Sequence, residues 1–202
     1  EPLRQKGFRV VAFDMPAHGF ARQRHASLID CVHALVAVAE AAGPFEVVVA
    51  HSLGGLVALM AAEGAPPLRG ASDFARFVLI ASPNRLTEFT ADFAGRQRLT
   101  PPAKRAFERH LERIGHRPVA AVSAARLLAA VARPALVIHA RDDAQVPFRN
   151  GEEIAASSSE AIFQPVDGFG HAGVIFAPPV VRMVRQYLLA AFEEPELVRT
   201  AS

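Results

Sequence analysis

The sequence predicts an α/β fold, with a mostly parallel sheet, helices on both of its faces and a small helical lid inserted between two strands. Short apolar runs rich in β-branched residues alternate along the chain with longer segments of helical periodicity. These runs are continuously apolar, as expected of parallel strands that are buried on both faces. Residues 85–130 contain no such run and have two or three amphipathic helical patterns, so we expect them to form the lid. The predicted division is a first core part at 1–84, the lid at 85–130 and a second core part at 131–202.

Five strands are expected, at residues 8–13, 46–50, 77–81, 135–140 and 161–165. A helix is predicted over 27–42, because Ser27 and Asp30 have the spacing of a capping box and Gly43 with Pro44 ends the pattern. Further helices are predicted from the glycines after Ser52 to Glu63, over about 148–158 and over 178–191.

The strongest chemical signal is the segment VVAHSLGG at residues 48–55. A strand that turns sharply into a helix would hold Ser52 on a strained elbow with its hydroxyl exposed. Ala50 and Gly54 are small, as a close approach of backbones in such a turn requires. The backbone N–H of Leu53, at the start of the helix, is a candidate oxyanion donor. The alternative is that Ser52 is only a helix N-cap after a buried strand.

A nucleophilic serine needs a base, and the base needs a carboxylate that orients it. Asp143 follows the strand at 135–140, and His171 follows the last strand between flexible glycines. Taken singly, Asp143 or its neighbour Asp142 could serve a turn, and His171 could be an ordinary loop histidine. The order Ser52, Asp143, His171, with each residue after a different predicted strand, favours a catalytic triad.

Four segments together resemble the α/β-hydrolase family over essentially the whole chain. They are DMPAHG at 14–19, AHSLGG at 50–55, ARDDAQVP at 140–147 and GFGH at 168–171. The resemblance implies that Ser52 is the nucleophile, Asp143 rather than Asp142 the acid, and His171 the base. It also implies a fold with further strands before residue 8, followed by a loop that supplies the second oxyanion donor.

This chain does not begin with Met, and nothing before Gly7 can supply that second donor. We expect that the N-terminal strands of the family are lacking here and that upstream residues supply them. Without such residues, an open sheet edge would favour self-association. Loss of one oxyanion donor would lower turnover by about 10²- to 10³-fold. A non-catalytic or oligomer-dependent truncated remnant is therefore the alternative to an active enzyme.

Composition excludes some other classes of function. Lys and Arg number 22 against 20 Asp and Glu, and no basic run is interleaved with aromatic residues, so we expect no nucleic-acid partner. No apolar stretch approaches the length of a membrane span, and Cys31 is the only cysteine. No His, Asp or Glu cluster suggests a metal site, and the chemistry needs no cofactor. A cytoplasmic location and a possible homo-oligomer are the remaining expectations.

The expected reaction is cleavage of a carboxylic ester or thioester of a small molecule through an acyl-enzyme on Ser52. A serine rather than an aspartate at the elbow argues against haloalkane dehalogenase and epoxide hydrolase chemistry. Lactonase, acyltransferase and perhydrolase reactions use the same triad and stay open. In the lid, apolar side chains could line an acyl pocket or form the lid's own core: Leu86, Phe89, Phe93, Leu99 and Phe107. The many lid arginines indicate a solvated basic face or, alternatively, a site for an anionic leaving group.

Overall fold

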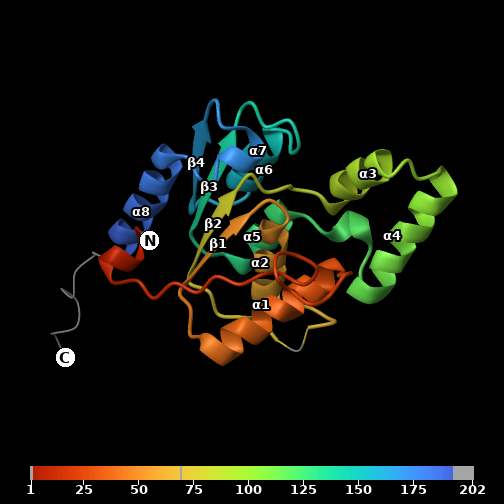
Figure 1. Cartoon of the computed structure of the whole chain (residues 1–202), viewed down its shortest axis with the longest axis horizontal. Helices are drawn as coiled ribbons and strands as arrows, with labels where there is room; N and C mark the ends of the chain where they lie inside the picture. The colour runs from red at the N-terminus through yellow and green to blue at the C-terminus, as the bar shows by residue number, and fades with distance from the viewer. Residues whose placement is uncertain (1, 69, 193–202) are drawn as a thin grey trace.

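The computed structural model describes residues 2–68 and 70–192 (Figure 1). Within them, one sheet of four parallel strands has the order β1-β2-β3-β4. The strands are β1 (Val47–His51), β2 (Arg76–Ile80), β3 (Ala135–Ala140) and β4 (Ala161–Val166). The predicted parallel sheet is confirmed, and four of the five expected strands lie within one residue of their predicted bounds.

Helices cover both faces of this sheet, as predicted. One face packs against α1 (Leu28–Ala42), α2 (Gly54–Glu63), α5 (Ala124–Val131) and α6 (Arg149–Ala156). The other face packs against α8 (Pro178–Phe192). The remaining elements are the short helix α7 (Gly170–Gly173), the 3₁₀ turns η1 (Arg4–Lys6) and η2 (Val119–Ala121), and the helices α3 (Leu86–Arg96) and α4 (Pro101–Gly115) of the segment predicted to be a lid, which is called the lid below. The capping box predicted at Ser27 and Asp30 is present at the start of α1.

The central strands β2 and β3 explain why the apolar runs do not alternate with polar residues. Phe77 and Leu79 join the core beneath α1 and α2, whereas Val78 and Ile80 join the core beneath α8. Successive side chains of a strand point to opposite faces, so a strand covered on both sides needs apolar residues at every position. Each fully buried side chain of this size contributes about 1.5–3 kcal/mol of hydrophobic stabilisation.

The strand predicted at residues 8–13 is wrong: this segment is irregular. A strand needs a hydrogen-bonded neighbour, and none of the described strands pairs with it. Instead, a groove of about 500 Å³ runs between residues 11–18 and β1, and Val49 on β1 is 49% exposed. Val10 and Val11 are 47% and 42% exposed, so their side chains are not buried as those of a paired strand would be. The guanidinium of Arg9 ties the segment to the carbonyl oxygens of Ala42 and Pro44.

Helices also form in the segment predicted to be the lid. Helices α3 and α4 project from the core (Figure 1), and the rings of Phe93 and Phe107 pack against each other between them with their centroids 5.1 Å apart. Helix α5 instead packs against α2 within the core. Across residues 2–68 and 70–192, no helix is both long and apolar enough to cross a membrane.

Candidate active site

The three predicted catalytic residues lie at the end of the sheet where the strands have their carboxyl ends. Ser52 directly follows β1, Asp143 follows β3 and His171 follows β4 on α7. Because all four strands are parallel, their carboxyl ends lie side by side there, and this is where sites form in open α/β sheets. The fold thus brings together residues that are 28 and 119 positions apart in the chain.

A continuous series of hydrogen bonds links these three side chains. His171 Nδ1 lies 2.8 Å from Asp143 Oδ2, and His171 Nε2 lies 3.0 Å from Ser52 Oγ. A carboxylate can only accept, so Nδ1 carries the imidazole proton and Nε2 is left as the acceptor for the Ser52 hydroxyl. The series therefore has the polarity that transfer of the serine proton to the histidine requires.

Ser52 occupies a strained turn. Its φ is +54°, a conformation that costs a residue other than glycine about 1–3 kcal/mol, and its N–H donates to the carbonyl of Ile80 at 2.9 Å. The position that requires glycine is Gly55 rather than Gly54, and the group that approaches it is the side chain of Ser82 rather than backbone. A Cβ at Gly55 would lie 2.2 Å from Ser82 Oγ, whereas a Cβ at Gly54 would make an ordinary contact of 3.8 Å with Ala50.

Leu53 lies between Ser52 and the first residue of α2. The N-terminal end of a helix carries a partial positive charge, so a developing anion beside Ser52 would be stabilised there. Leu53 and Ser52 also line the groove beside β1, so the elbow is reached from that side as well.

Asp143 is held by its own loop. Its side chain is fully buried, and Oδ1 accepts hydrogen bonds from the N–H groups of Gln145 and Val146, each at 2.8 Å. These two bonds fix the carboxylate so that Oδ2 faces His171.

Asp142, the alternative acid, has a different task. Its two carboxylate oxygens accept from the N–H groups of Gly168 and Gly170, each at 3.0 Å. Asp142 therefore binds the loop that carries His171 rather than the imidazole itself. The sequence indicated only a turn for this residue, and the loop contact was not predicted.

His51 contributes a second contact to the histidine loop. Its Nε2 donates to the carbonyl oxygen of His171 at 2.8 Å, and the two rings lie 4.8 Å apart. Burial lowers the pKa of His51, which favours a neutral ring. A neutral ring places no second positive charge beside His171 when that residue accepts a proton. This contact was not predicted from the sequence.

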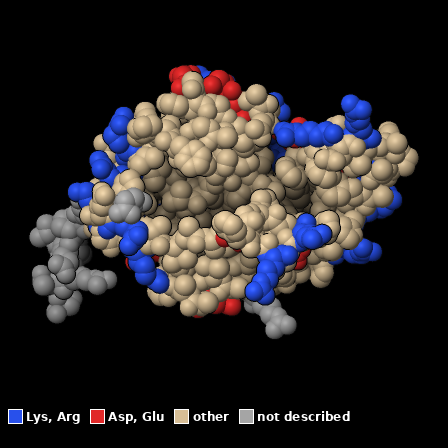
Figure 2. Space-filling view, in the orientation of Figure 1, with Lys and Arg blue, Asp and Glu red and all other residues tan. Residues whose placement is uncertain are grey.

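A pocket of about 380 Å³ has Ser52 and His171 in its wall. Apolar lining comes from Phe89 and from Val146 and Pro147 of the loop at 141–147 after β3, here called the acid loop. One of the five apolar residues named above for the predicted lid therefore faces this pocket. Phe93 and Phe107 pack on each other within the lid, and Leu86 is buried against the core. The surface is hollowed between core and lid (Figure 2).

The charged part of this lining consists of ion pairs. Arg96 lies 2.8 Å from Asp92, and Arg149 lies 3.2 Å from Glu88. Lys and Arg side chains also gather over the projecting lid (Figure 2). Two opposite pairs leave the lining without a net charge, so they make the wall polar rather than cationic.

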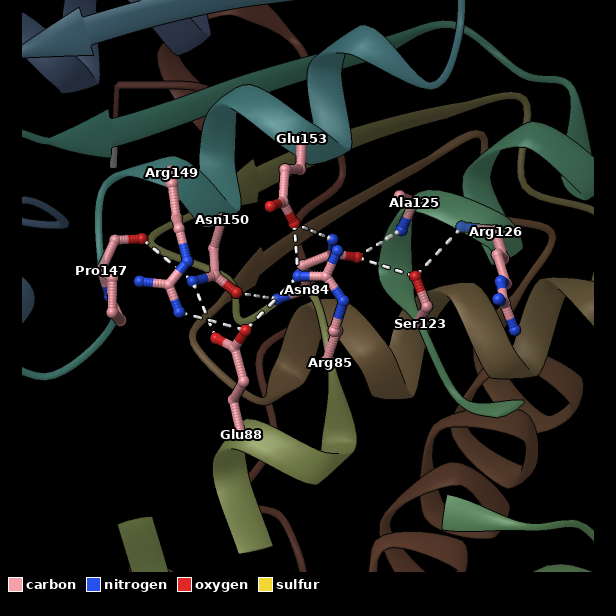
Figure 3. Close-up of polar contacts among 10 residues, drawn as sticks. All are labelled: Asn84, Arg85, Glu88, Ser123, Ala125, Arg126, Pro147, Arg149, Asn150 and Glu153. Atoms are coloured by element: carbon pink, nitrogen blue, oxygen red, sulfur yellow. Dashed lines mark hydrogen bonds and ion pairs between the residues drawn. The ribbon is translucent and has the colours of Figure 1, made fainter. Parts of the chain in front are cut away.

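A buried polar cluster joins the two ends of the lid to α6 (Figure 3). We call it the lid brace, and it consists of Asn84, Ser123, Ala125, Asn150 and Glu153. At its centre Asn84, only 1% exposed, accepts at Oδ1 from Ser123 Oγ at 2.8 Å and from the N–H of Ala125 at 3.0 Å. Asn84 Nδ2 donates to Glu153 at 2.6 Å, and its N–H donates to the side chain of Asn150 at 2.6 Å. The lid brace thus fixes where the chain leaves the core for the lid and where it returns.

Substitution Asn84→Ala should lower the free energy of unfolding by about 3 kcal/mol, because it leaves several buried polar groups unpaired. The measurement is urea denaturation. Gln97→Ala, which removes an exposed amide in the lid, serves as the control and should change stability by less than about 0.5 kcal/mol. Equal stability of the two variants would contradict the role given to the lid brace.

Comparison with known proteins agrees with this fold. The sequence matches the profile of the alpha/beta hydrolase family over residues 1–200. No curated protein matches it significantly. Among solved structures, NosK from Streptomyces actuosus is similar with a TM-score of 0.64 and 22% identity, over 94% of this chain and 89% of that one.

Two further structures have the same fold. A hydrolase from Pseudomonas aeruginosa has a TM-score of 0.63 and 22% identity, over 95% of this chain and 82% of its own. Est1E from Butyrivibrio proteoclasticus, solved with ferulic acid bound, has a TM-score of 0.64 and 14% identity, over 89% of this chain and 75% of its own. Since the family profile spans nearly the whole sequence, the chain belongs to the alpha/beta hydrolase family.

Proposed function

We propose that this hydrolase cleaves carboxylic esters through an acyl-enzyme on Ser52. The observation that carries the proposal is the hydrogen-bonded series from Ser52 through His171 to Asp143. Membership of the family and its hydrolase neighbours support hydrolysis in general. The ester bond and the individual roles of the three residues are the further step proposed here.

In the first half of the reaction, Ser52 Oγ attacks the acyl carbonyl carbon while His171 Nε2 accepts the hydroxyl proton. The carbonyl electrons move to its oxygen, which rests near the N–H of Leu53. When the tetrahedral intermediate collapses, the carbon–oxygen bond to the alcohol breaks. His171 returns the proton to the departing alkoxide, which leaves as a neutral alcohol.

In the second half, a water molecule replaces the alcohol. His171 accepts one proton from the water as its oxygen attacks the acyl carbon, and then returns it to Ser52 Oγ as the acid leaves. Throughout, the buried carboxylate of Asp143 orients the imidazole and stabilises its protonated form. The scheme uses only side chains, water and backbone N–H groups, and requires no cofactor.

The pocket supports small substrates. A volume of about 380 Å³, part of it bounded by the pairs Arg96–Asp92 and Arg149–Glu88, suits a short acyl chain better than a long alkyl chain. We therefore expect p-nitrophenyl acetate and butyrate to be hydrolysed with a higher kcat/KM than p-nitrophenyl palmitate. A preference for palmitate would contradict this assignment of the pocket.

A second candidate is an oligomer-dependent or non-catalytic form, which is favoured by the edge of β1 that no other described strand covers. This edge faces the groove that also reaches Ser52 and Leu53, so a strand from another molecule could bind there. Specific activity measured over a range of protein concentrations separates the candidates. A constant specific activity supports the self-sufficient enzyme, a rise with concentration supports the oligomer, and no activity supports the non-catalytic form.

A further inference from the structure

His139 is a buried histidine in the central strand β3, outside the series formed by Ser52, His171 and Asp143. Its side chain is fully buried. Nε2 lies 3.0 Å from the carbonyl oxygen of Val146 and 3.5 Å from Asp143 Oδ2. Both of these neighbours can only accept, so Nε2 carries the proton and points it at the acid loop.

The other ring nitrogen of His139 is unusual. Nδ1 is buried and has no hydrogen-bond partner within the described part of the chain. Burial also lowers the pKa of His139, in keeping with a neutral ring. An aliphatic side chain would avoid an unpaired buried nitrogen in a strand whose other residues are Ala, Leu, Val and Ile. Packing alone therefore does not account for a histidine at this position.

The surroundings of the ring restrict its movement. Helix α6 approaches it so closely that a Cβ at Gly151 would lie 2.9 Å from His139 Nδ1. The ring of Phe148 meets it edge to face with the centroids 6.0 Å apart. The titratable groups that act on the ring are Asp143, on the acid loop, and His171 beyond it. His139 is thus held with its donor directed at the acid loop.

We propose that His139 is a positioning residue for the hydrolysis proposed above, on which this inference rests. Its Nε2–H holds the acid loop through the Val146 carbonyl and supports Oδ2 of Asp143, the oxygen that faces His171. Oδ1 of Asp143 then accepts hydrogen bonds from Gln145 and Val146, and Oδ2 lies 2.8 Å from His171 Nδ1. The N–H of His139 Nε2 lies on the same side of Oδ2, at the longer distance of 3.5 Å, as an electrostatic contact. His139 fixes the carboxylate and, through it, the direction of the imidazole.

The test compares His139→Leu with His139→Gln, using kcat and KM for p-nitrophenyl butyrate over a range of pH. Leu fills much of the space but donates nothing, whereas the amide of Gln can place an N–H near the position of Nε2. We expect His139→Leu to lower kcat by about 10- to 100-fold with little change in KM, by analogy with partners that orient the ligands of a metal site. His139→Gln should recover most of this loss.

The pH profile separates positioning from a purely structural role. Without the N–H dipole of His139 beside Oδ2, the Asp143 carboxylate becomes a stronger acceptor for the protonated imidazole. The midpoint of the acidic limb of kcat/KM should then move to higher pH in His139→Leu and return in His139→Gln. Ile138→Val, a buried change in the same strand, is the control for lost packing and should leave both kcat and the midpoint unchanged.

The outcomes also distinguish this inference from the proposed function. A wild-type chain that hydrolyses the ester, with His139→Leu equal to it in kcat and midpoint, overturns the role of His139 and leaves the function standing. The same holds if His139→Leu and Ile138→Val lose kcat alike with no change in midpoint. A wild-type chain with no Ser52-dependent hydrolysis overturns both proposals.

Discussion

Ser52→Ala is expected to lower kcat for p-nitrophenyl butyrate by about 10⁴- to 10⁶-fold, the range seen when a serine nucleophile is removed. Without Oγ no acyl-enzyme can form, and His171 has no hydroxyl to deprotonate at 3.0 Å. We expect little change in KM, because substrate binding in the pocket beside the lid does not depend on the missing oxygen. The measurement is steady-state hydrolysis followed by release of p-nitrophenol.

Ser82→Ala is the matched control for this change. Ser82, like Ser52, directly follows a strand, but it is buried, and its hydroxyl has no hydrogen-bond partner among the described residues. Removal of this hydroxyl should change kcat by no more than about twofold, because no hydrogen bond is lost with it. Retained activity in Ser52→Ala, or an equal loss in both variants, would contradict the role of Ser52.

Asp143→Asn is expected to lower kcat by about 10⁴-fold. The backbone N–H groups of Gln145 and Val146 require an acceptor at Oδ1, so the amide oxygen of the new side chain occupies that position. Its NH₂ group then faces His171 Nδ1, which must accept rather than donate. The imidazole proton moves to Nε2, and Nε2 can no longer accept the proton of Ser52.

Two neighbouring variants check this explanation. Asp167→Asn changes a carboxylate that is 77% exposed and should have no effect on kcat. Asp142→Asn keeps one of the two acceptors for the loop at Gly168 and Gly170, so its loss should be much smaller than that of Asp143→Asn. A loss in Asp142→Asn as large as in Asp143→Asn would contradict the choice of acid.

The sheet was predictable where burial alone determines the pattern. Strand β3 was predicted with the bounds it has, because its six residues are buried on both faces and polar residues follow at once. Residues 8–13 have a similar apolar pattern but form no strand, because no described strand pairs with them. The local sequence indicates whether a segment tends to form a strand, but it does not indicate whether a neighbouring strand is present to pair with it.

The candidate site was predictable to the extent that it depends on strand ends. Ser52, Asp143 and His171 each follow a strand, and parallel strands bring those ends together. The supporting contacts were not predictable, since they join backbone and side chains of distant segments. The ring of His51 contacts the backbone carbonyl of a residue 120 positions away. The N–H of Asn84 donates to the side chain of a residue 66 positions away.

The position of Gly55 shows the same limit. Two consecutive glycines follow Leu53, and the sequence gives no means of telling which one the fold requires. The requirement at Gly55 comes from Ser82, which lies beyond the next strand. Only the packing of α2 against the end of β2 determines it.

The most direct test of the central claim is covalent labelling with a fluorophosphonate. Its phosphorus takes the place of the acyl carbon, so an activated Ser52 Oγ should displace fluoride and form a stable bond. Intact-mass measurement should give one adduct per chain, peptide fragmentation should locate it at Ser52, and neither Ser52→Ala nor Asp143→Asn should react at a comparable rate. Absence of an adduct on the wild-type chain, or an adduct on a different residue, would contradict the account.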